Sequence, residues 1–562
     1  MSTARGSRVV VHARSVIVRW VAASLLACAA LPVLVRRAAA QEVGSDRQAL
    51  GIVDFPVRCA AEVQPDFNRA VALLHHMTYP TARQAFQSVA ARDPSCAMAY
   101  WGVAMTLFQP LWPTRPDSAA LRQGWEAVER ARTLRPPTRR EALYVEATAA
   151  FFLDPASSDY WLRIRRWAGA QATVHDSFPD DAEAVAFHAL ALLANAPVGG
   201  LPREDSDRIA AMLVDVYDAN PEHPGAMHYL VHTNDAVGRE REELDVTEKY
   251  ESVAPRNPHA LHMPTHIYTR IGDWNHVIQG NLAAATAALE TPAGPSGDLV
   301  WDEFPHALEY LVYAHLQKGE DQEAALEFER LRETPSIEPT FKTAFHMASI
   351  PARYALERRA WSEAAMLEPR TPGWLDWNRF AWPEAITWYA RGLGAAHLGD
   401  AATADAALGA LGALEAKMDA VGEDLFARNI RVLRLELTGW SNHVRSRNDS
   451  AVARVREALD LEEATPKHAV TPAPTLPAGE VLGDLLMELA QPADALDAYR
   501  RALARYPNRF NGLLGAARAA RAAGNEAVAR AYYTELLELA SDGTRAESLR
   551  EAREYVEREA VR

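Results

Sequence analysis

Hydrophobic and small residues recur along the chain at helical spacing, and the apolar stretches after residue 41 do not alternate as a strand would. The clearest pattern lies near the C-terminus, where Ala495 and Tyr499 recur 34 positions later as Ala529 and Tyr533. Small residues let two helices approach while an aromatic side chain fills the gap between them. Pro507, which closes the first of these units, cannot continue a helix. The pattern predicts an all-α chain built from helix–turn–helix hairpins, without a substantial sheet.

The same spacing continues toward the N-terminus with less regularity. Its prolines and aromatic residues mark further hairpins: Phe86 with Pro94, Tyr217 with Pro224, Tyr250 with Pro258, and the block 305–319. Insertions at 109–117, 291–298 and 370–378 interrupt the period. The segment 464–479 contains four prolines. We therefore expect a large helical array over 41–463, a Pro-rich linker over 464–479 and a short C-terminal array over 480–562.

A 34-residue period with these small and aromatic positions resembles the tetratricopeptide repeat (TPR) family, most strongly over residues 478–540. The resemblance implies an α-solenoid in which the first helix of each unit lines a concave groove, ending in a short C-terminal TPR pair. The stretches 96–102, 227–232 and 259–266 also resemble a group of exported bacterial TPR proteins. That second resemblance implies the fold and export, and it implies no reaction.

Composition limits the classes of partner. The chain has 562 residues, a formal charge of −15 and 49% hydrophobic residues. A chain this long exceeds one ordinary core, which favours several domains or a repeat array. The acidic balance is spread along the chain, so nothing in it resembles the basic face that nucleic-acid binding requires. We expect a partner that is a protein, a peptide or a small molecule.

The N-terminal residues 1–40 form a predicted signal peptide. Four arginines precede an apolar run over 20–35, and three alanines at 38–40 offer a cleavage site. Lipid attachment at Cys28, or retention of the segment as an anchor, remains an alternative and would be the chain's only route to a membrane. Export to the periplasm or the extracellular space leaves Cys59 and Cys96, which we expect to form a disulfide. Two separately buried thiols are the alternative.

Histidine spacing provides the main functional signal. The pairs His228/His232 and His262/His266 stand 34 residues apart, so they occupy equal positions on neighbouring hairpins. Residues four apart share a helix face, with Cβ atoms about 5–6 Å apart, and neighbouring helix axes lie about 8–10 Å apart. Four imidazoles are therefore predicted to face one strip of surface. In the same register the flanking units place Glu183 and Glu309.

Neutral imidazoles with carboxylates suit Zn, Cu, Ni or Fe. Four histidines would close such a site, whereas three histidines, or two with a carboxylate, would leave a position for water or substrate. The sequence offers further ligands or hydrogen-bond acceptors nearby: His259, His306, His276 and Asp235. Pro264 falls between His262 and His266 and would either sit in a first helical turn or tilt the two rings apart. Other interpretations are a polar ligand-binding groove and ordinary packing of hydrogen-bonded rings.

Two functions remain open at this point. The first is an exported scaffold that binds a protein, peptide or small ligand in its concave groove. The second is a metalloprotein or metalloenzyme that uses His228, His232, His262 and His266, with Glu183 or Glu309 as ligand or general base. The sequence contains no His-Glu-x-x-His motif, phosphate loop or nucleophile elbow, so it assigns no reaction and implies no organic cofactor. Arg353 is expected to pair with a carboxylate of the ligand or of the protein itself.

Overall fold

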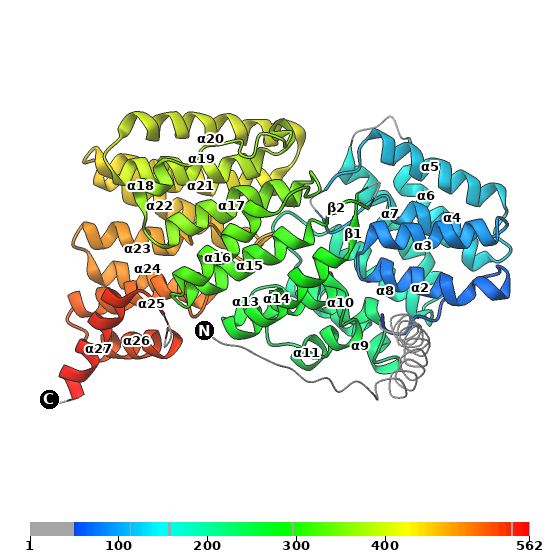
Figure 1. The fold of residues 1–562 in the computed structure, drawn as a ribbon, viewed down its shortest axis with the longest axis horizontal. Coiled ribbons are helices and arrows are strands. Elements are labelled where there is room, and N and C mark those ends of the chain that lie inside the picture. The colour runs from blue at the N-terminus through cyan, green and yellow to red at the C-terminus, as the bar shows by residue number, and fades with distance from the viewer. Residues whose placement is uncertain (1–49, 113, 155–158, 295–296, 541–542, 561–562) are drawn as a thin grey trace, which may run out of the picture. The chain divides into compact units, whose positions relative to one another are not determined.

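Antiparallel helices follow one another through the computed structural model, which describes residues 50–112, 114–154, 159–294, 297–540 and 543–560. Figure 1 shows the helices packed side by side in chain order. The prediction of an all-α, TPR-like α-solenoid is confirmed. The predicted signal peptide and Cys28 lie outside the described residues.

The N-terminal elements, in chain order, are η1 Ala61–Val63, α2 Gln64–His75, α3 Tyr79–Arg92, α4 Ala97–Met105, α5 Ser118–Thr133, α6 Arg139–Phe152, α7 Tyr160–Ser177, α8 Ala182–Ala194 and α9 Arg203–Ala219. The central elements are α10 Pro224–Asn234, α11 Leu244–Val253, α12 Pro258–His262, α13 Pro264–Ile271, α14 Trp274–Glu290, β1 Pro292–Ala293, β2 Leu299–Val300, α15 Glu303–Gln317, α16 Asp321–Glu333, α17 Phe341–Glu357 and α18 Trp361–Ala365. The C-terminal elements are η2 Trp377–Arg379, α19 Ala381–His397, α20 Ala401–Val421, α21 Asp424–Val444, α22 Asn448–Glu463, α23 Ala478–Glu488, α24 Pro492–Arg505, α25 Phe510–Ala522, α26 Glu526–Leu539 and α27 Ala546–Ala560. Strands β1 and β2 pair antiparallel, with Pro292 opposite Val300.

The close approach of helices explains the repeated small and aromatic residues. In the C-terminal repeats, the ring of Tyr499 lies between Gly483 and Gly515 on the two adjoining helices. A Cβ atom at Gly483 would lie 2.6 Å from this ring, and one at Gly515 would lie 2.4 Å from it. Contacts this short are not tolerated, so only glycine fits at these positions. The glycines thereby set the spacing of helices α23, α24 and α25.

The Pro-rich segment 464–479, expected as a linker, is packed into the protein. Val470, Ala473 and Leu476 are buried, and the residues from Gly51 onward form one compact unit. Proline lacks an N–H group, so a segment rich in proline needs fewer backbone partners when it is buried. Backbone carbonyls of the segment accept hydrogen bonds from a buried arginine: Arg353 donates to the oxygens of Ala473 and Pro474 at 3.0 and 2.8 Å.

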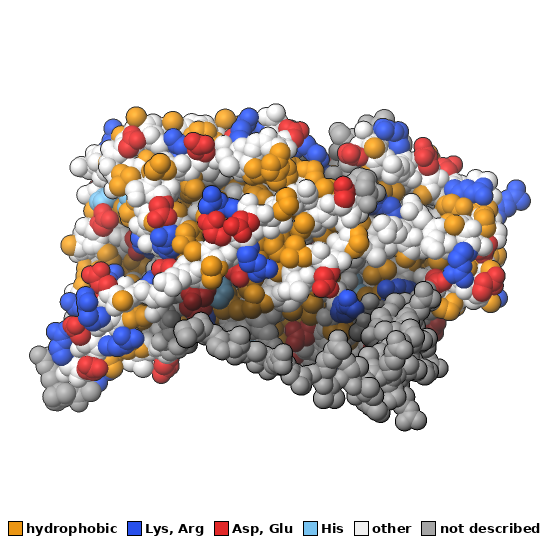
Figure 2. Space-filling model, viewed as in Figure 1, with side chains coloured by type: hydrophobic (Ala, Val, Ile, Leu, Met, Phe, Trp, Pro, Cys, Tyr) orange, Lys and Arg blue, Asp and Glu red, His pale blue; other side chains and the backbone are white. Residues whose placement is uncertain are grey.

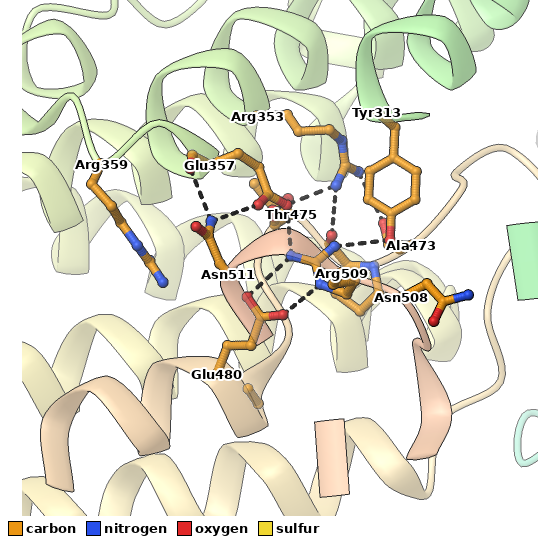
Figure 3. A network of polar contacts seen from close by, with 12 residues as sticks. Tyr313, Arg353, Glu357, Arg359, Ala473, Thr475, Glu480, Asn508, Arg509 and Asn511 are labelled. Carbon is orange, nitrogen blue, oxygen red and sulfur yellow. Dashed lines mark hydrogen bonds and ion pairs between the residues drawn. The ribbon is translucent and has the colours of Figure 1, made fainter. Parts of the chain in front are cut away.

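A buried ion-pair network joins the C-terminal repeats to the rest of the array (Figure 3). Arg509, which is fully buried, pairs with Glu480 at 2.5 Å and with Glu357 of α17 at 2.7 Å. It also donates to the hydroxyl of Tyr313 on α15 at 2.8 Å. Asn511 adds a hydrogen bond to the backbone oxygen of Glu357. Helices α15, α17, α23 and α25 are thereby held together through one guanidinium group.

A disulfide joins Cys59 to Cys96, with Cα atoms 4.8 Å apart. It ties the segment before α2 to the start of α4. Among the described residues, no helix has both the length and the hydropathy needed to cross a bilayer. Acidic and basic side chains are interspersed on the face shown in Figure 2.

Candidate metal centre

Six imidazoles gather where helices α10, α12, α13 and α15 meet, and all of them are buried except His232, which is partly buried. They form two sets of three, and in each set the possible ligand atoms lie within 4.8 Å of one another. We call His228, His232 and His259 the first trio, and we call His262, His266 and His306 the second trio. Prolines at the first turn of α10, α12 and α13 start these helices where the N–H group is not needed.

Within the second trio, two ring nitrogens face each other without a proton between them. Asn281 donates its amide to the backbone oxygen of Val277, so its Oδ1 atom accepts from Nδ1 of His262 at 2.7 Å. Nδ1 of His266 donates to the carboxylate of Asp235 at 2.9 Å. Both protons are therefore on Nδ1, and the Nε2 atoms present lone pairs to each other at a distance of 2.9 Å. A cation between them would relieve this repulsion.

The first trio repeats the arrangement. Nδ1 of His228 donates to the backbone oxygen of His75 at 2.6 Å, and Nδ1 of His259 lies 3.2 Å from the carboxylate of Glu303. The backbone oxygen assigns the proton of His228 to Nδ1. Nδ1 of His259 makes no hydrogen bond, but the negative charge of Glu303 favours a proton there, so that the Nε2 atoms of the two rings face each other as lone pairs at 3.1 Å. Nε2 of His232, which is also buried, has no hydrogen-bond partner among the described residues.

A relay of hydrogen bonds orients the sixth ring. Glu309 accepts from Nδ1 of His346 and from Arg353. His346 therefore presents the lone pair of its Nε2 atom to Nδ1 of His306, at 3.0 Å. His306 must donate from Nδ1, which leaves its Nε2 atom unprotonated and able to bind a metal ion with the other two rings of the second trio. A carboxylate that acts through histidine on a ligand is a common way to fix the tautomer of a metal-binding ring.

Burial keeps five of the six rings uncharged. It lowers the pKa of His228, His232, His262 and His306 well below the usual histidine range. Burial also lowers the pKa of His266, to about 4. At neutral pH no additional proton is therefore available to bridge the Nε2 atoms of His262 and His266. Neutral imidazole is also the form that binds metal ions.

A second layer of charges surrounds the rings. Burial opposes ionisation of Asp235, but Lys467 and Arg270 outweigh it and hold the pKa of this carboxyl well below its usual range. Burial likewise opposes ionisation of Glu303, and Lys342 with His259 outweighs it and lowers the pKa. The two carboxylates are therefore ionised. Asp235 fixes the Nδ1 proton of His266 through a hydrogen bond, and the charge of Glu303 favours the same tautomer of His259.

Both trios border one small cavity. It measures about 20 Å³ and is lined by His232, His259, Met263, His266, His306, Lys342, His468, Ala469, Val470, Leu111 and Trp112. A volume of this size accommodates about one water-sized molecule. The cavity therefore offers an open position beside the nitrogens of each trio.

The structure brings together the four histidines predicted from the 34-residue spacing. Pro264 does not part them: α12 ends at His262, α13 begins at Pro264, and the rings of His262 and His266 remain in contact. His276, named as a nearby candidate, is exposed and pairs with Asp273 outside the cluster. Asp235 lies behind His266 as a hydrogen-bond acceptor.

The two predicted carboxylate ligands lie elsewhere, and neither belongs to a trio. Glu183 accepts from His75 at 2.6 Å and from His223 at 3.2 Å. Burial opposes its ionisation, but the two imidazoles outweigh this effect and lower its pKa. Because each ring's other nitrogen is also bonded, this group is a satisfied polar network. Glu309 contacts His346, which in turn contacts His306. Its carboxylate therefore influences the second trio only through these two rings.

The position of His259 and His306 relative to the repeated prolines could have indicated that they belong to the cluster. Each directly follows the proline of its unit, Pro258 or Pro305. Because the two residues share this position in their repeats, they could have been grouped with the two histidine pairs that are 34 residues apart. His346 has no equivalent in the repeat, because it comes from α17 and reaches His306 only in the folded protein. Arg353 forms the ion pair within the protein that was one of its two expected roles.

Comparisons with known proteins add little. No protein-family model matches the chain, and no curated protein matches it. One similar solved structure is the APC/C hetero-tetramer Cut9–Hcn1, with 14% identity, coverage of 89% of this chain and 96% of that chain, and a TM-score of 0.27. Another is the human IFIT1 dimer with PPP-AAAA, with 12% identity, coverage of 84% and 90%, and a TM-score of 0.37. TM-scores this low do not establish a relationship, so the fold is assigned from the helices of the structure itself.

Proposed function

We propose that this protein is an exported metalloprotein that binds two transition-metal ions, one in each histidine trio. The observation that supports the proposal is the convergence of Nε2 lone pairs. Hydrogen bonds fix the Nδ1 proton on four of the six rings. The negative charge of Glu303 favours the same tautomer of His259, and burial keeps the other five rings neutral. Without a cation, two pairs of lone pairs would repel each other inside the protein at 2.9 and 3.1 Å.

The spacing of the nitrogens supports the same proposal. Metal–nitrogen bonds of about 2.0–2.1 Å place two ligands of one tetrahedral ion about 3 to 3.5 Å apart. The facing nitrogens are at or close to this separation before any ion is bound. Three imidazoles and one open position, which the cavity supplies, make up a ligand set of the kind found in reactive rather than purely structural sites. Imidazole donors favour Zn, Cu or Fe over Mg or Ca.

Export is a separate part of the proposal. The Cys59–Cys96 disulfide supports it, because disulfides persist in oxidising compartments such as the periplasm. The arginine-rich, apolar N-terminal segment supports it independently. Fractionation of cells that express the full chain, with a C-terminal epitope tag, tests it. Recovery of the protein in the cytoplasm with free thiols would contradict it.

Metal content tests the central proposal. Protein purified without a polyhistidine tag is dialysed against chelator, titrated with Zn²⁺ or Cu⁺, and assayed by elemental analysis. We expect two equivalents to be retained after gel filtration. The variants His228→Asn and His262→Asn preserve an N–H group near the position of Nδ1 but lack the Nε2 ligand. Each is expected to retain one equivalent, and the double variant none.

His276→Asn is the matched control, because this histidine is exposed and outside both trios. It should retain two equivalents. Thermal unfolding of every variant shows whether the fold persists. Retention of less than a tenth of an equivalent by the wild-type protein, with no uptake of any of the tested ions, would falsify the proposal.

A second role, binding of a peptide or protein, has one supporting observation of its own. A cleft of about 570 Å³ lies between α17–α19 and the C-terminal repeats, with Arg359, Trp361 and Arg518 in its wall. Trp361 stacks on His397 at 3.7 Å between ring centroids, which gives the cleft an aromatic side. Selection from a displayed peptide library tests this role. Enriched peptides should lose binding to Arg518→Glu and retain it with His276→Asn.

A further inference from the structure

We propose that the two trios hold a pair of copper ions and that the cavity between them binds one molecule of dioxygen. This inference rests on the proposed metal-binding function and assigns it a metal and a ligand class. It depends on three features of the described residues: the charge of the ligand set, the position of the two trios about one cavity, and the character of the cavity wall.

The ligand set favours ions of low charge. All six ligands are imidazole rings, which bind metal ions in their neutral form, and the grouped residues include no carboxylate or thiolate in either trio. The carboxylates near the rings are matched in number by cations: Asp235 pairs with Lys467 and Arg270, Glu303 and Asp302 share Lys342, and Glu309 pairs with Arg353.

A pair of divalent ions would therefore bring four uncompensated positive charges into a buried site, whereas two Cu⁺ ions bring two. Burial of uncompensated charge is costly. Among the metals that imidazole binds well, copper alone is commonly available to proteins as a monovalent ion. The reduced copper pair is thus the form that this site accommodates best.

The two trios are close enough to act on one ligand. The ring centroids of His232 and His266, which belong to different trios, lie 6.3 Å apart, and those of His259 and His262 lie at the same distance. Rings of both trios line the cavity of about 20 Å³. An ion in either trio would therefore have its open position directed at the same space.

The wall of the cavity selects a small uncharged molecule. Leu111, Trp112, Met263 and Val470 contribute apolar surface, and the volume corresponds to about one water-sized molecule. Lys342 also lines the cavity, and its ammonium group lies 3.5 Å from the centroid of the Trp112 ring. Dioxygen enters as a neutral molecule, and the nearby ammonium group would stabilise negative charge that develops on it.

The electrons balance within the site. Each Cu⁺ gives one electron, so two Cu⁺ ions convert O₂ into a peroxide dianion held between two Cu²⁺ ions. The O–O bond order falls from two to one, and no proton is consumed. Addition of two protons releases H₂O₂ and leaves two Cu²⁺ ions. An external one-electron donor, such as ascorbate in the test, returns both ions to Cu⁺.

Oxygen uptake tests the inference. Full-length protein is loaded without oxygen with two equivalents of Cu⁺, then mixed with oxygenated buffer while an electrode records consumption. We expect one O₂ for every two copper ions. The product should give no electron paramagnetic resonance signal, because the spins of two adjacent Cu²⁺ ions couple. Acid should then release one H₂O₂ for each O₂ taken up.

The single-trio variant His262→Asn provides the discriminating control. It should bind one copper ion and lose at least nine-tenths of the oxygen uptake, since one Cu⁺ supplies only one electron. Val470→Phe fills the cavity without removing a ligand. It should retain two copper ions while oxygen uptake falls at least tenfold, and its thermal unfolding shows that the fold is intact.

The outcomes separate this inference from the function on which it rests. Two copper ions bound with no oxygen uptake, or with the signal of isolated Cu²⁺, would overturn the dioxygen site and leave the metal sites standing. Equal oxygen uptake by the wild type and His262→Asn would also overturn it. Failure to bind any metal would overturn both proposals.

Discussion

Nε2 of His262 lies 2.9 Å from Nε2 of His266, although Pro264 separates the helices that carry the two rings. Pro264 occupies the first turn of α13, where its missing N–H group costs nothing. The chain therefore passes from α12 to α13 without moving the two imidazoles apart. Asn281 and Asp235 then fix both protons on the far nitrogens. The two Nε2 atoms therefore already lie close to the separation that two ligands of one tetrahedral metal ion would have.

Metal ions should stabilise the folded protein. The unfolded chain has no preformed trio, so each ion bound by the folded state adds about 2.7 kcal/mol at a free concentration of 100 times its Kd. Calorimetry of chelator-treated protein, with and without added metal, measures the effect as an upward shift of Tm. The double variant His228→Asn/His262→Asn should show no shift. An equal shift in that variant would place the stabilising ion outside the trios.

The relay behind His306 predicts an effect at a distance. In Glu309→Gln, the new amide group can donate to Nδ1 of His346, which moves the proton of that ring to Nε2. His346 then faces His306 as a donor, and His306 can accept only by carrying its own proton on Nε2, where it blocks the metal. Loss of such a supporting partner lowers metal affinity by about 10- to 100-fold.

Isothermal titration of the second trio measures this change, in a background where His228→Asn has removed the first site. Glu320→Gln is the matched control. Glu320 also accepts a hydrogen bond from a histidine, Nδ1 of His315 at 2.7 Å, and His315 lies on α15 but outside the cluster. It should leave the affinity unchanged. Equal losses in both variants would reduce the effect to general destabilisation.

The 34-residue period was sufficient to predict both the helical fold and the meeting of four histidines, because equal phase in stacked hairpins places side chains on one strip. It failed for Glu183, which shares the phase of His228 and His262 but binds His75 and His223 instead. A buried carboxylate takes the nearest N–H donors, and those come from helix α2 and the start of α10. Their proximity is a property of the packed array, which local spacing does not encode. The role of His346 could not be predicted from the sequence for the same reason.

The disulfide should contribute to stability and leave the metal sites unaffected. Cys59 and Cys96 are 37 positions apart, and closing a loop of this length in the unfolded chain is worth about 4 kcal/mol in the chain-entropy account. We expect Cys59→Ser/Cys96→Ser to lower the free energy of unfolding by about 2–4 kcal/mol in urea titration. The variant should still retain two equivalents of metal. Loss of metal without loss of stability would contradict this separation.

A buried carboxyl group in the C-terminal half predicts a pH dependence of stability. Burial raises the pKa of Glu462 to about 7, although its carboxylate accepts a hydrogen bond from the backbone N–H of Ala478 at 3.1 Å. In the unfolded chain this pKa is about 4.3. The folded state therefore binds a proton more tightly than the unfolded state. The resulting stabilisation is present in full below about pH 4.3 and is lost as the pH rises through 7.

Glu462→Gln should remove this dependence, since glutamine keeps an oxygen acceptor for Ala478 and does not ionise. Urea titrations of the wild type and the variant between pH 5 and 8.5 measure the difference in their free energies of unfolding. The shift in pKa corresponds to a change on the order of 3 kcal/mol in this difference across the pH range. The variant should become more stable relative to the wild type as the pH rises. Glu463→Gln, next to it and partly exposed, is the control and should follow the wild type. Parallel pH profiles for the wild type and Glu462→Gln would show that Glu462 is ionised in the folded protein throughout this range.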